Sequence, residues 1–270
     1  MEFRPCIDIH NGKVKQIVGG TLRDEGDFAA ENFVSEQDSV FYAELYKKYG
    51  LRNGHIILLN PVTSEYYRET KAQALAALRA WPGGIQVGGG ITPETAGEFL
   101  EAGASHVIVT SYVFKDGQIN RENLKKMVSV CGKEQLVLDL SCRKRDGKYY
   151  VVTDRWQKFT DMEVTVDALA ELAECCDEFL IHAADVEGKA NGVERELVSL
   201  LTEAAEKLAE KDPAGRAFPI TYAGGVGSFE DLRWLKEAGM GLIHVTIGSA
   251  LDLFGGEMKF KEVTEYIAQE

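Results

Sequence analysis

Two stretches of the chain, one in each half, resemble each other closely. QVGGGITPETAGEFLEAGASHVIVTS begins at Gln86, and TYAGGVGSFEDLRWLKEAGMGLIHVTIGS begins at Thr221. Each stretch predicts a strand, a Gly-Gly turn, a helix, a second strand and a small polar residue. The two are separated by about half of the 270 residues. A unit of half the chain that occurs twice is the feature that most constrains the fold.

Eight short apolar segments bounded by Gly, Asn or Asp predict strands, and segments with apolar residues every three or four positions predict helices between them. Several strands are apolar on both faces, which is typical of parallel strands covered by helices. We therefore expect an α/β fold, a single (β/α)8 TIM barrel over residues 1–270 with two-fold pseudosymmetry, its (β/α)4 halves spanning about 1–132 and 133–270. An open doubly wound sheet is the alternative. The expected strands are Phe3–Ile9, His55–Leu59, Gly84–Val87, His106–Thr110, Gln135–Leu140, Glu178–Ala183, Phe218–Ala223 and Leu242–Ile247.

Two long segments interrupt this alternation. Thr21–Gln37 is predicted as a polar loop after the first strand. Cys142–Thr160 contains a turn at Lys144–Gly147 followed by the β-rich YYVV, which predicts an excursion above the fifth strand. Loops of this length in a compact domain usually serve function.

One aspartate stands near the end of the first strand and another near the end of the fifth. Asp8 lies between Ile7 and Ile9, and Asp139 lies between two leucines. Because side chains alternate along a strand, both carboxylates are expected to point toward the barrel axis, facing each other across its carboxyl-terminal end. A single such aspartate is as well explained by a hydrogen bond to a loop. Two at equivalent places of a repeat favour acid–base chemistry.

Small residues at the strand ends predict two phosphate sites. Glycine lets backbone N–H groups approach phosphate oxygens, and a following helix adds a favourable dipole. Ordinary tight turns would explain one Gly-Gly pair, but the symmetric sets favour a long ligand with a phosphate at each end. The first-half set is Gly89, Gly90, Thr110 and Ser111, and the second-half set is Gly224, Gly225, Gly248 and Ser249.

Composition excludes several classes of function. The net charge of −13 argues against an electrostatic nucleic-acid binder. No signal peptide, membrane-spanning run of apolar residues or metal-ligand spacing is present in the sequence, so we expect a cytoplasmic protein without a metal. The cysteines are odd in number and lack a CxxC pair, which favours reduced thiols. They are Cys6, Cys131, Cys142, Cys175 and Cys176.

The sequence resembles a known family along essentially its whole length. CIDIHNGKVKQIVGG, IQVGGGI, LVLDL, FLIHAADVEG, YAGGV and HVTIGSAL are similar, in this order, to the phosphoribosylformimino-5-aminoimidazole carboxamide ribotide isomerases of histidine biosynthesis. The likeness is greatest to the variant familiar from fungi and plants. It implies a monomer that performs an Amadori rearrangement of an aminoaldose to an aminoketose, on a substrate with two phosphates, without metal or organic cofactor.

The resemblance also implies roles for individual residues. Asp8 would be the general base that removes the C2 proton, and Asp139 the general acid that protonates the furanose ring oxygen. Trp156 would either stack on the aminoimidazole or anchor its loop, and Gly188, with Glu187, would lie near the second phosphate. Two histidines are open: His182 is more simply a hydrogen-bonded core residue, and His10 would orient a loop, contact phosphate or be solvated.

The chain departs from the family's usual pattern in three places. Ala183 follows the strand-six histidine where many members have Thr, Leu59–Pro61 ends the second strand where others have Asp, and Arg143–Asp146 is longer than a compact glycine turn. Two alternatives stay open. The paralogous cyclase has the same two aspartates and phosphate sites but needs ammonia, and a barrel that only binds phosphorylated ligands would need neither carboxylate.

Overall fold

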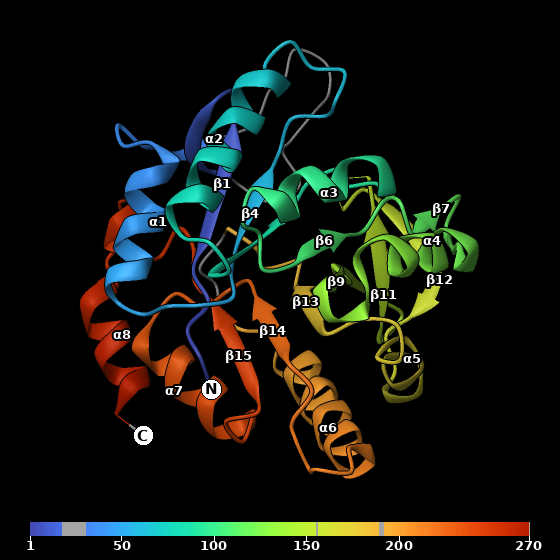
Figure 1. The fold of residues 1–270 in the computed structure, drawn as a ribbon. Helices are drawn as coiled ribbons and strands as arrows, with labels where there is room; N and C mark the ends of the chain where they lie inside the picture. Colours follow the sequence, from blue (N-terminus) through green and yellow to red (C-terminus); the bar gives the residue numbers. More distant parts are fainter. Residues whose placement is uncertain (18–30, 155, 189–191, 270) are drawn as a thin grey trace.

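In the part of the chain that the structure describes, a curled, mostly parallel sheet has eight helices on its outer side, which is consistent with a TIM barrel (Figure 1). The computed structural model describes residues 1–17, 31–154, 156–188 and 192–269. The sheet order is β15-β14-β13-β9-β6-β5-β4-β1-β2-β3. Its strands are β1 (Cys6–His10), β2 (Lys13–Ile17), β3 (Glu31–Val34), β4 (Gly54–Leu58), β5 (Ile85–Gly88), β6 (Val107–Val109), β9 (Leu136–Asp139), β13 (Glu178–His182), β14 (Ile220–Ala223) and β15 (Ile243–Thr246).

Every strand expected from the sequence is present, with ends that differ by a few residues. These eight strands are the parallel members of the sheet, each paired in parallel with its neighbour from β1 to β15. Their carboxyl ends therefore meet at one edge, where the predicted site residues lie. An isolated parallel bridge between Phe3 and Val245 joins the start of the chain to β15, at the far end of the strand order.

The helices follow the strands in alternation. Apolar residues three and four apart bury one face of each helix; in α6 this face includes Leu197, Leu201 and Leu208. Side-chain caps begin two of the helices: Thr92 forms a capping box at the start of α3, and the Ser228 side chain accepts from Asp231 N at the start of α7. The helices are α1 (Ser39–Lys48), α2 (Tyr67–Ala80), α3 (Pro93–Glu101), α4 (Arg121–Cys131), α5 (Val166–Leu172), α6 (Arg195–Lys211), α7 (Phe229–Ala238) and α8 (Phe260–Ala268).

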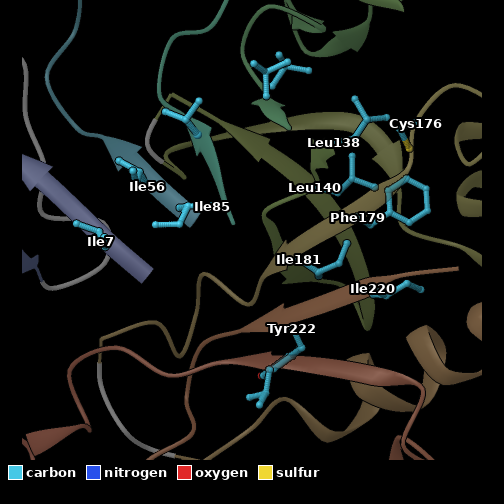
Figure 2. Packing of buried hydrophobic residues seen from close by; sticks show 14 of the residues in the cluster. Ile7, Ile56, Ile85, Leu138, Leu140, Cys176, Phe179, Ile181, Ile220 and Tyr222 are labelled. Carbon is cyan, nitrogen blue, oxygen red and sulfur yellow. The ribbon is translucent and has the colours of Figure 1, made fainter. Parts of the chain in front are cut away.

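Alternation along the strands divides the core into two parts. Ile7, Leu138 and Ile181 belong to the large cluster that packs between the sheet and the helices (Figure 2). The residues in between belong to the other face, where Val137 and Leu180 form a small separate cluster with Ile108 and Ala223. Because side chains alternate, Asp8, Asp139 and His182 share this inner face. The sheet therefore directs the predicted carboxylates inward.

A buried ion pair fills the opposite, amino-terminal end of the sheet. The Arg4 guanidinium lies 2.5 Å from Glu178 Oε1, and both side chains are almost fully buried. Thr221 and Gln86 donate hydrogen bonds to the same carboxylate, at 2.6 and 2.7 Å. These residues come from the start of the chain and from β5, β13 and β14. The pair and its hydrogen bonds therefore connect the first half of the chain to the second.

The described residues of both interrupting segments include strands. Cys142–Thr160 forms the predicted excursion, a three-stranded antiparallel sheet of β10 (Cys142–Arg145), β11 (Lys148–Thr153) and β12 (Lys158–Glu163). The prediction of a loop over Thr21–Gln37 is wrong at residues 31–34, because β3 pairs with β2 and extends the sheet beyond β1. The remainder of that prediction, up to residue 30, lies outside the described residues. A small hairpin of β7 (Phe114–Lys115) and β8 (Gln118–Ile119) follows β6.

Candidate active site

Asp8 lies on the inner face of β1, two residues before the strand ends. The Gln16 side-chain amide, which reaches across from β2, donates a hydrogen bond to Asp8 Oδ2 at 3.2 Å. Burial and, to a smaller extent, the negative charge of Glu187 raise the pKa of Asp8 to about 7, against the opposing effects of His182 and the Gln16 hydrogen bond. A carboxyl group with a pKa near neutral pH is matched to proton abstraction.

Asp139 lies at the end of β9 in a set of hydrogen bonds that favour a carboxylate. Its Oδ1 accepts from the Ser141 backbone N–H at 2.9 Å and from the Ser141 hydroxyl at 2.7 Å. His182 Nδ1, from the end of β13, lies 3.3 Å from the same oxygen. Burial raises the pKa of Asp139, but the His182 charge and these hydrogen bonds outweigh it and hold the pKa below its ordinary value.

His182 is a cation in this arrangement. Burial lowers the pKa of the imidazole, but Asp139, Glu187 and Asp8 together raise it to about 9. The interpretation of His182 as a core histidine is correct in that the side chain is hydrogen-bonded and only 12% exposed. It is wrong about location, because His182 lines a pocket instead of packing within the apolar core. Alternation along β13 accounts for this, since His182 shares the inner face with Leu180.

The pocket lies at the carboxyl ends of β13, β14 and β15 and is also lined by Asp8 of β1 and by His55, near the start of β4. It brings together six of the predicted site residues, namely Asp8, Gly188, Gly224, Gly225, Gly248 and Ser249. Asp139 does not line it, but reaches it through His182. The first-half set lies outside this pocket, at the ends of the neighbouring strands β5 and β6; it comprises Gly89, Gly90, Thr110 and Ser111.

The two Gly-Gly turns have nearly the same backbone conformation. Gly89 and Gly90 have φ of 105° and 73°, and Gly224 and Gly225 have φ of 115° and 76°. These values lie in a region that L side chains rarely adopt, which explains the glycines. A Cβ on Gly89 would collide with the Leu58 carbonyl oxygen, so this position also needs close approach between backbones.

Glu187 and His55 complete the polar lining. Glu187 Oε2 is buried without a hydrogen-bond partner among the described residues, and a Cβ on Gly224 would lie 3.0 Å from it. Burial raises the pKa of this carboxyl, and His182 lowers it in part. Burial and the His182 charge lower the pKa of His55, on β4, to about 3, so His55 is neutral.

Sequence reasoning placed Glu187 near a phosphate and assigned no role to His55 or Gln16. The alternation that identified Asp8 was available for His55, since it shares a face of β4 with the inward Ile57. No comparable pattern pointed to Gln16, because β2 pairs antiparallel with β1 only after a turn that the apolar spacing does not show.

Trp156 lies over His182, with ring centroids 5.9 Å apart. Its φ of 67° is unusual for a bulky residue, so neighbouring contacts must hold it there. The Arg143 guanidinium donates to Trp156 O at 3.5 Å and pairs with Asp185 at 2.7 Å, which ties the excursion to the loop after β13. His10, at the end of β1, is buried. The interpretation of His10 as a solvated residue is therefore wrong.

The described residues contain neither a candidate metal site nor a helix that could span a membrane. Over residues 1–17, 31–154, 156–188 and 192–269, no three His, Cys, Asp or Glu side chains are grouped in a way that would hold a metal ion. None of the helices in these ranges has the length and apolar character needed to cross a membrane. All five cysteines are unpaired thiols.

Comparisons with known proteins agree with the resemblance. Residues 2–259 match the family model described as histidine biosynthesis protein. A relative from Medicago truncatula is 50% identical and aligns with all of this chain and 83% of its own length. Relatives from Yarrowia lipolytica and Saccharomyces cerevisiae are 44% and 43% identical, each over at least 96% of both chains. All three are named as 1-(5-phosphoribosyl)-5-((5-phosphoribosylamino)methylideneamino) imidazole-4-carboxamide isomerases, and the Medicago protein is named as chloroplastic.

Proposed function

The chain belongs to the histidine biosynthesis protein family, and from this premise we propose that it is the isomerase for which its relatives are named. The reaction is an aldose–ketose isomerisation, the Amadori rearrangement of the phosphoribosylformimino aminoaldose to its phosphoribulosyl form. One observation carries the proposal for the site: a single pocket holds Asp8 and the histidine that binds Asp139, beside the Gly224–Gly225 turn. Acid–base groups and an anion-binding turn are what this substrate requires.

In this proposal Asp8 is the general base and Asp139 is the general acid. Asp8, with its pKa near 7, takes the proton from C2 of the ribosyl unit. The Asp139 side of the pocket delivers a proton to the furanose ring oxygen, so that the ring opens to an imine. Proton transfers of this kind each contribute roughly 10²- to 10⁴-fold to the rate. The two carboxyl groups differ in their surroundings: burial and Glu187 raise the pKa of Asp8, whereas His182 and Ser141 hold the pKa of Asp139 below its ordinary value.

The two phosphates are assigned to the two glycine turns. Gly188, Gly224, Gly225, Gly248 and Ser249 line the pocket and form the proposed site for one phosphate. The other site is formed by the ends of β5 and β6, where Gly90 is exposed and open around its Cα; its proposed residues are Gly89, Gly90, Thr110 and Ser111. Trp156, which already contacts His182, covers the middle of the substrate.

The proposal for the fold is a single closed barrel, residues 1–270, of two related halves at about 1–132 and 133–270. Three observations support it: the Phe3–Val245 bridge, the matching φ values of the glycine turns, and the ion pair of Arg4 with Glu178. We also propose a cytoplasmic monomer that uses no metal or organic cofactor. The printed location of the Medicago relative applies to that protein.

An assay with the aminoaldose ribotide tests the function directly. The purified chain should convert it to the aminoketose in the absence of ammonia and without an added metal. Appearance of imidazole glycerol phosphate only when ammonia is supplied would identify the cyclase instead. Binding of the aminoaldose without any conversion would leave a binding protein. Either result would overturn the isomerase.

A further inference from the structure

We propose that Gln16 is the positioning residue of the catalytic base: its side-chain amide holds the Asp8 carboxyl group in place beside the proposed phosphate site at Gly248. The inference rests on the proposed isomerase function and deepens it. Gln16 lies on β2, outside the eight parallel strands that provide the two aspartates.

A tight turn brings β2 back along the strand that carries Asp8. The turn consists of Asn11–Gly12, with φ values of 51° and 70°, and β2 runs antiparallel to β1 after it. Two residues with positive φ match the twist of a β-hairpin. Asn60 and Thr70 accept hydrogen bonds from the two backbone N–H groups of the turn, at 2.8 and 3.0 Å. The backbone that carries Gln16 is therefore fixed relative to Asp8.

The amide group of Gln16 is buried and directed at the base. Gln16 is 4% exposed, and its Nε2 donates to Asp8 Oδ2 at 3.2 Å and lies 3.7 Å from the Cys6 sulfur. Burial raises the pKa of Cys6 well above its ordinary value, so this neighbour stays a neutral thiol. An amide turned the other way would place its oxygen against the Asp8 carboxylate. The amide therefore has one favourable orientation.

Asp8 depends on this contact more than Asp139 depends on any one of its own. Within the residues that the structure describes, Asp8 receives one hydrogen bond, from Gln16. Asp139 accepts two from Ser141 and also lies beside His182. Because a misplacement of about 1 Å can cost roughly 10²-fold in rate, a base held by a single side chain is sensitive to its loss.

Gly248 provides the space that the Gln16 amide occupies. A Cβ on Gly248 would collide with Gln16 Oε1. The φ of Gly248 lies outside the left-handed region, unlike those of Gly224 and Gly225, so its backbone conformation does not require glycine. The close approach of Gln16 explains the glycine instead. One side chain thus contacts the base through its nitrogen and the proposed phosphate site through its oxygen.

The groups around Asp8 set the direction of the expected effect. Burial is the main cause of its raised pKa, and Glu187, in the loop after β13, adds to it. His182, at the end of β13, and the Gln16 hydrogen bond lower the pKa, because both stabilise the carboxylate. His55, on β4, is neutral, since burial lowers its pKa to about 3. Loss of the Gln16 bond therefore raises the pKa of Asp8 above about 7 and leaves less of the base ionised at neutral pH.

Gln16→Met tests the proposal, because methionine keeps the length of the side chain and removes the amide. We expect kcat to fall by about tenfold, the value of one hydrogen bond to a charged group, and KM to change less. The acid limb of kcat/KM, which reports the free enzyme, should move from about 7 to higher pH. Gln118→Met is the matched control, because Gln118 also donates to an aspartate, Asp161 at 3.4 Å, outside the pocket. It should keep the wild-type values.

A Gln16→Met enzyme with wild-type kcat and an acid limb still near pH 7 would overturn the proposal. A raised KM with kcat and the acid limb unchanged would also overturn it, because Gln16 would then bind the substrate and not position the base.

If Gln16→Met does not fold, Gly248→Ala is the second variant, since its Cβ displaces the Gln16 amide. The Asp8 carboxyl group is then followed by carbon NMR in the free enzyme, where neither turnover nor phosphate binding affects the result. It should titrate near pH 7 in the wild type and at higher pH in the variant. Equal titration in the two proteins would contradict the inference. A wild-type enzyme that does not convert the aminoaldose would refute the proposed function, whereas the NMR titration would still decide the role of Gln16.

Discussion

The turn at Gly89–Gly90 and the turn at Gly224–Gly225 have the same backbone shape in different surroundings. Their φ values agree within about 10°, and a capped helix follows each. The first-half turn is open, with no atom within 4 Å of a Cβ placed on Gly90. At Gly225 such a Cβ would collide with the Gly192 carbonyl oxygen, because the loop after β13 covers this turn. Similar sequences therefore set the same backbone, while a loop from elsewhere in the chain decides which turn lines the pocket.

The two aspartates differ in the same way. Asp8 and Asp139 occupy matching places on the inner face of their strands, yet burial and Glu187 raise the pKa of the first while His182 and Ser141 hold that of the second down. The differences come from Glu187, His182 and Ser141, all in the second half of the chain. The comparison shows that repetition places the functional groups and that the surroundings divide their roles.

The largest effect on stability should come from breaking the buried ion pair that connects the two halves of the chain. Glu178→Gln leaves the Arg4 guanidinium buried without its main counter-charge, and loss of one partner of a buried ion pair typically costs about 3–5 kcal/mol. We expect a loss of stability in this range in urea unfolding, with the pocket at the other end of the strands unaffected. The control is Glu171→Gln, which removes an exposed ion pair with Arg121 and should change stability by less than about 1 kcal/mol. Equal losses in the two variants would show that the buried pair does not hold the halves together.

The next largest effect is the loss of kcat expected when either aspartate of the site is replaced. Asp8→Asn removes the base, and Asp139→Asn removes the carboxylate that holds the imidazole of His182, so each should lower kcat by roughly 10² or more. Asp177→Asn, which removes a carboxylate bound to a histidine outside the pocket, should leave kcat unchanged. Circular dichroism should show the wild-type fold in all three. Near wild-type turnover in both site variants would mean that neither aspartate takes part.

The pH profile should report the same division of roles. Asp8 must be ionised, so kcat/KM rises as pH increases through about 7. The pKa of His182 is about 9, and deprotonation removes the positive charge beside Asp139, so kcat/KM should fall as pH increases through about 9. Glu187→Gln removes a negative charge that raises the pKa of Asp8, and should therefore move the acid limb to lower pH. A maximum on the acid side of pH 7 would contradict the role of Asp8 as the base.

The sequence predicted the parts of this molecule that depend on local pattern. The eight parallel strands and the excursion over Cys142–Thr160 follow from apolar spacing and turn residues, which act over a few neighbours. Alternation also identified the inward direction of Asp8 and Asp139. The strand β3 was missed because the segment that leads to it from β2 is rich in glycine and charged residues and has no alternating apolar run.

The parts that were not predicted depend on contacts between distant segments. The pairing of His182 with Asp139 joins residues 43 positions apart, and nothing local distinguishes it from a histidine in the core. Contacts between distant segments also explain Asn60, which stands where other members of the family have Asp. Asn60 is buried, accepts from Asn11 N at 2.8 Å and from the Thr70 hydroxyl at 2.7 Å, and so ties the β1–β2 turn to α2. A residue that looked like an altered substrate contact holds the backbone beside the site.

The smallest effect tests the comparison of the two turns itself. Gly90→Ala places an L residue at a φ of 73° in open space, so only backbone strain opposes it, and stability should fall by about 1 kcal/mol. Gly225→Ala has the same strain at 76° and the additional collision with Gly192 O. Because Gly192 N donates to Gly225 O at 3.0 Å, the collision displaces the loop that carries Glu187 and Gly188. Urea unfolding and KM for the aminoaldose should therefore change more in Gly225→Ala. Equal changes in both measurements would mean that the covering loop does not distinguish the two halves, and that backbone shape alone determines the behaviour of each turn.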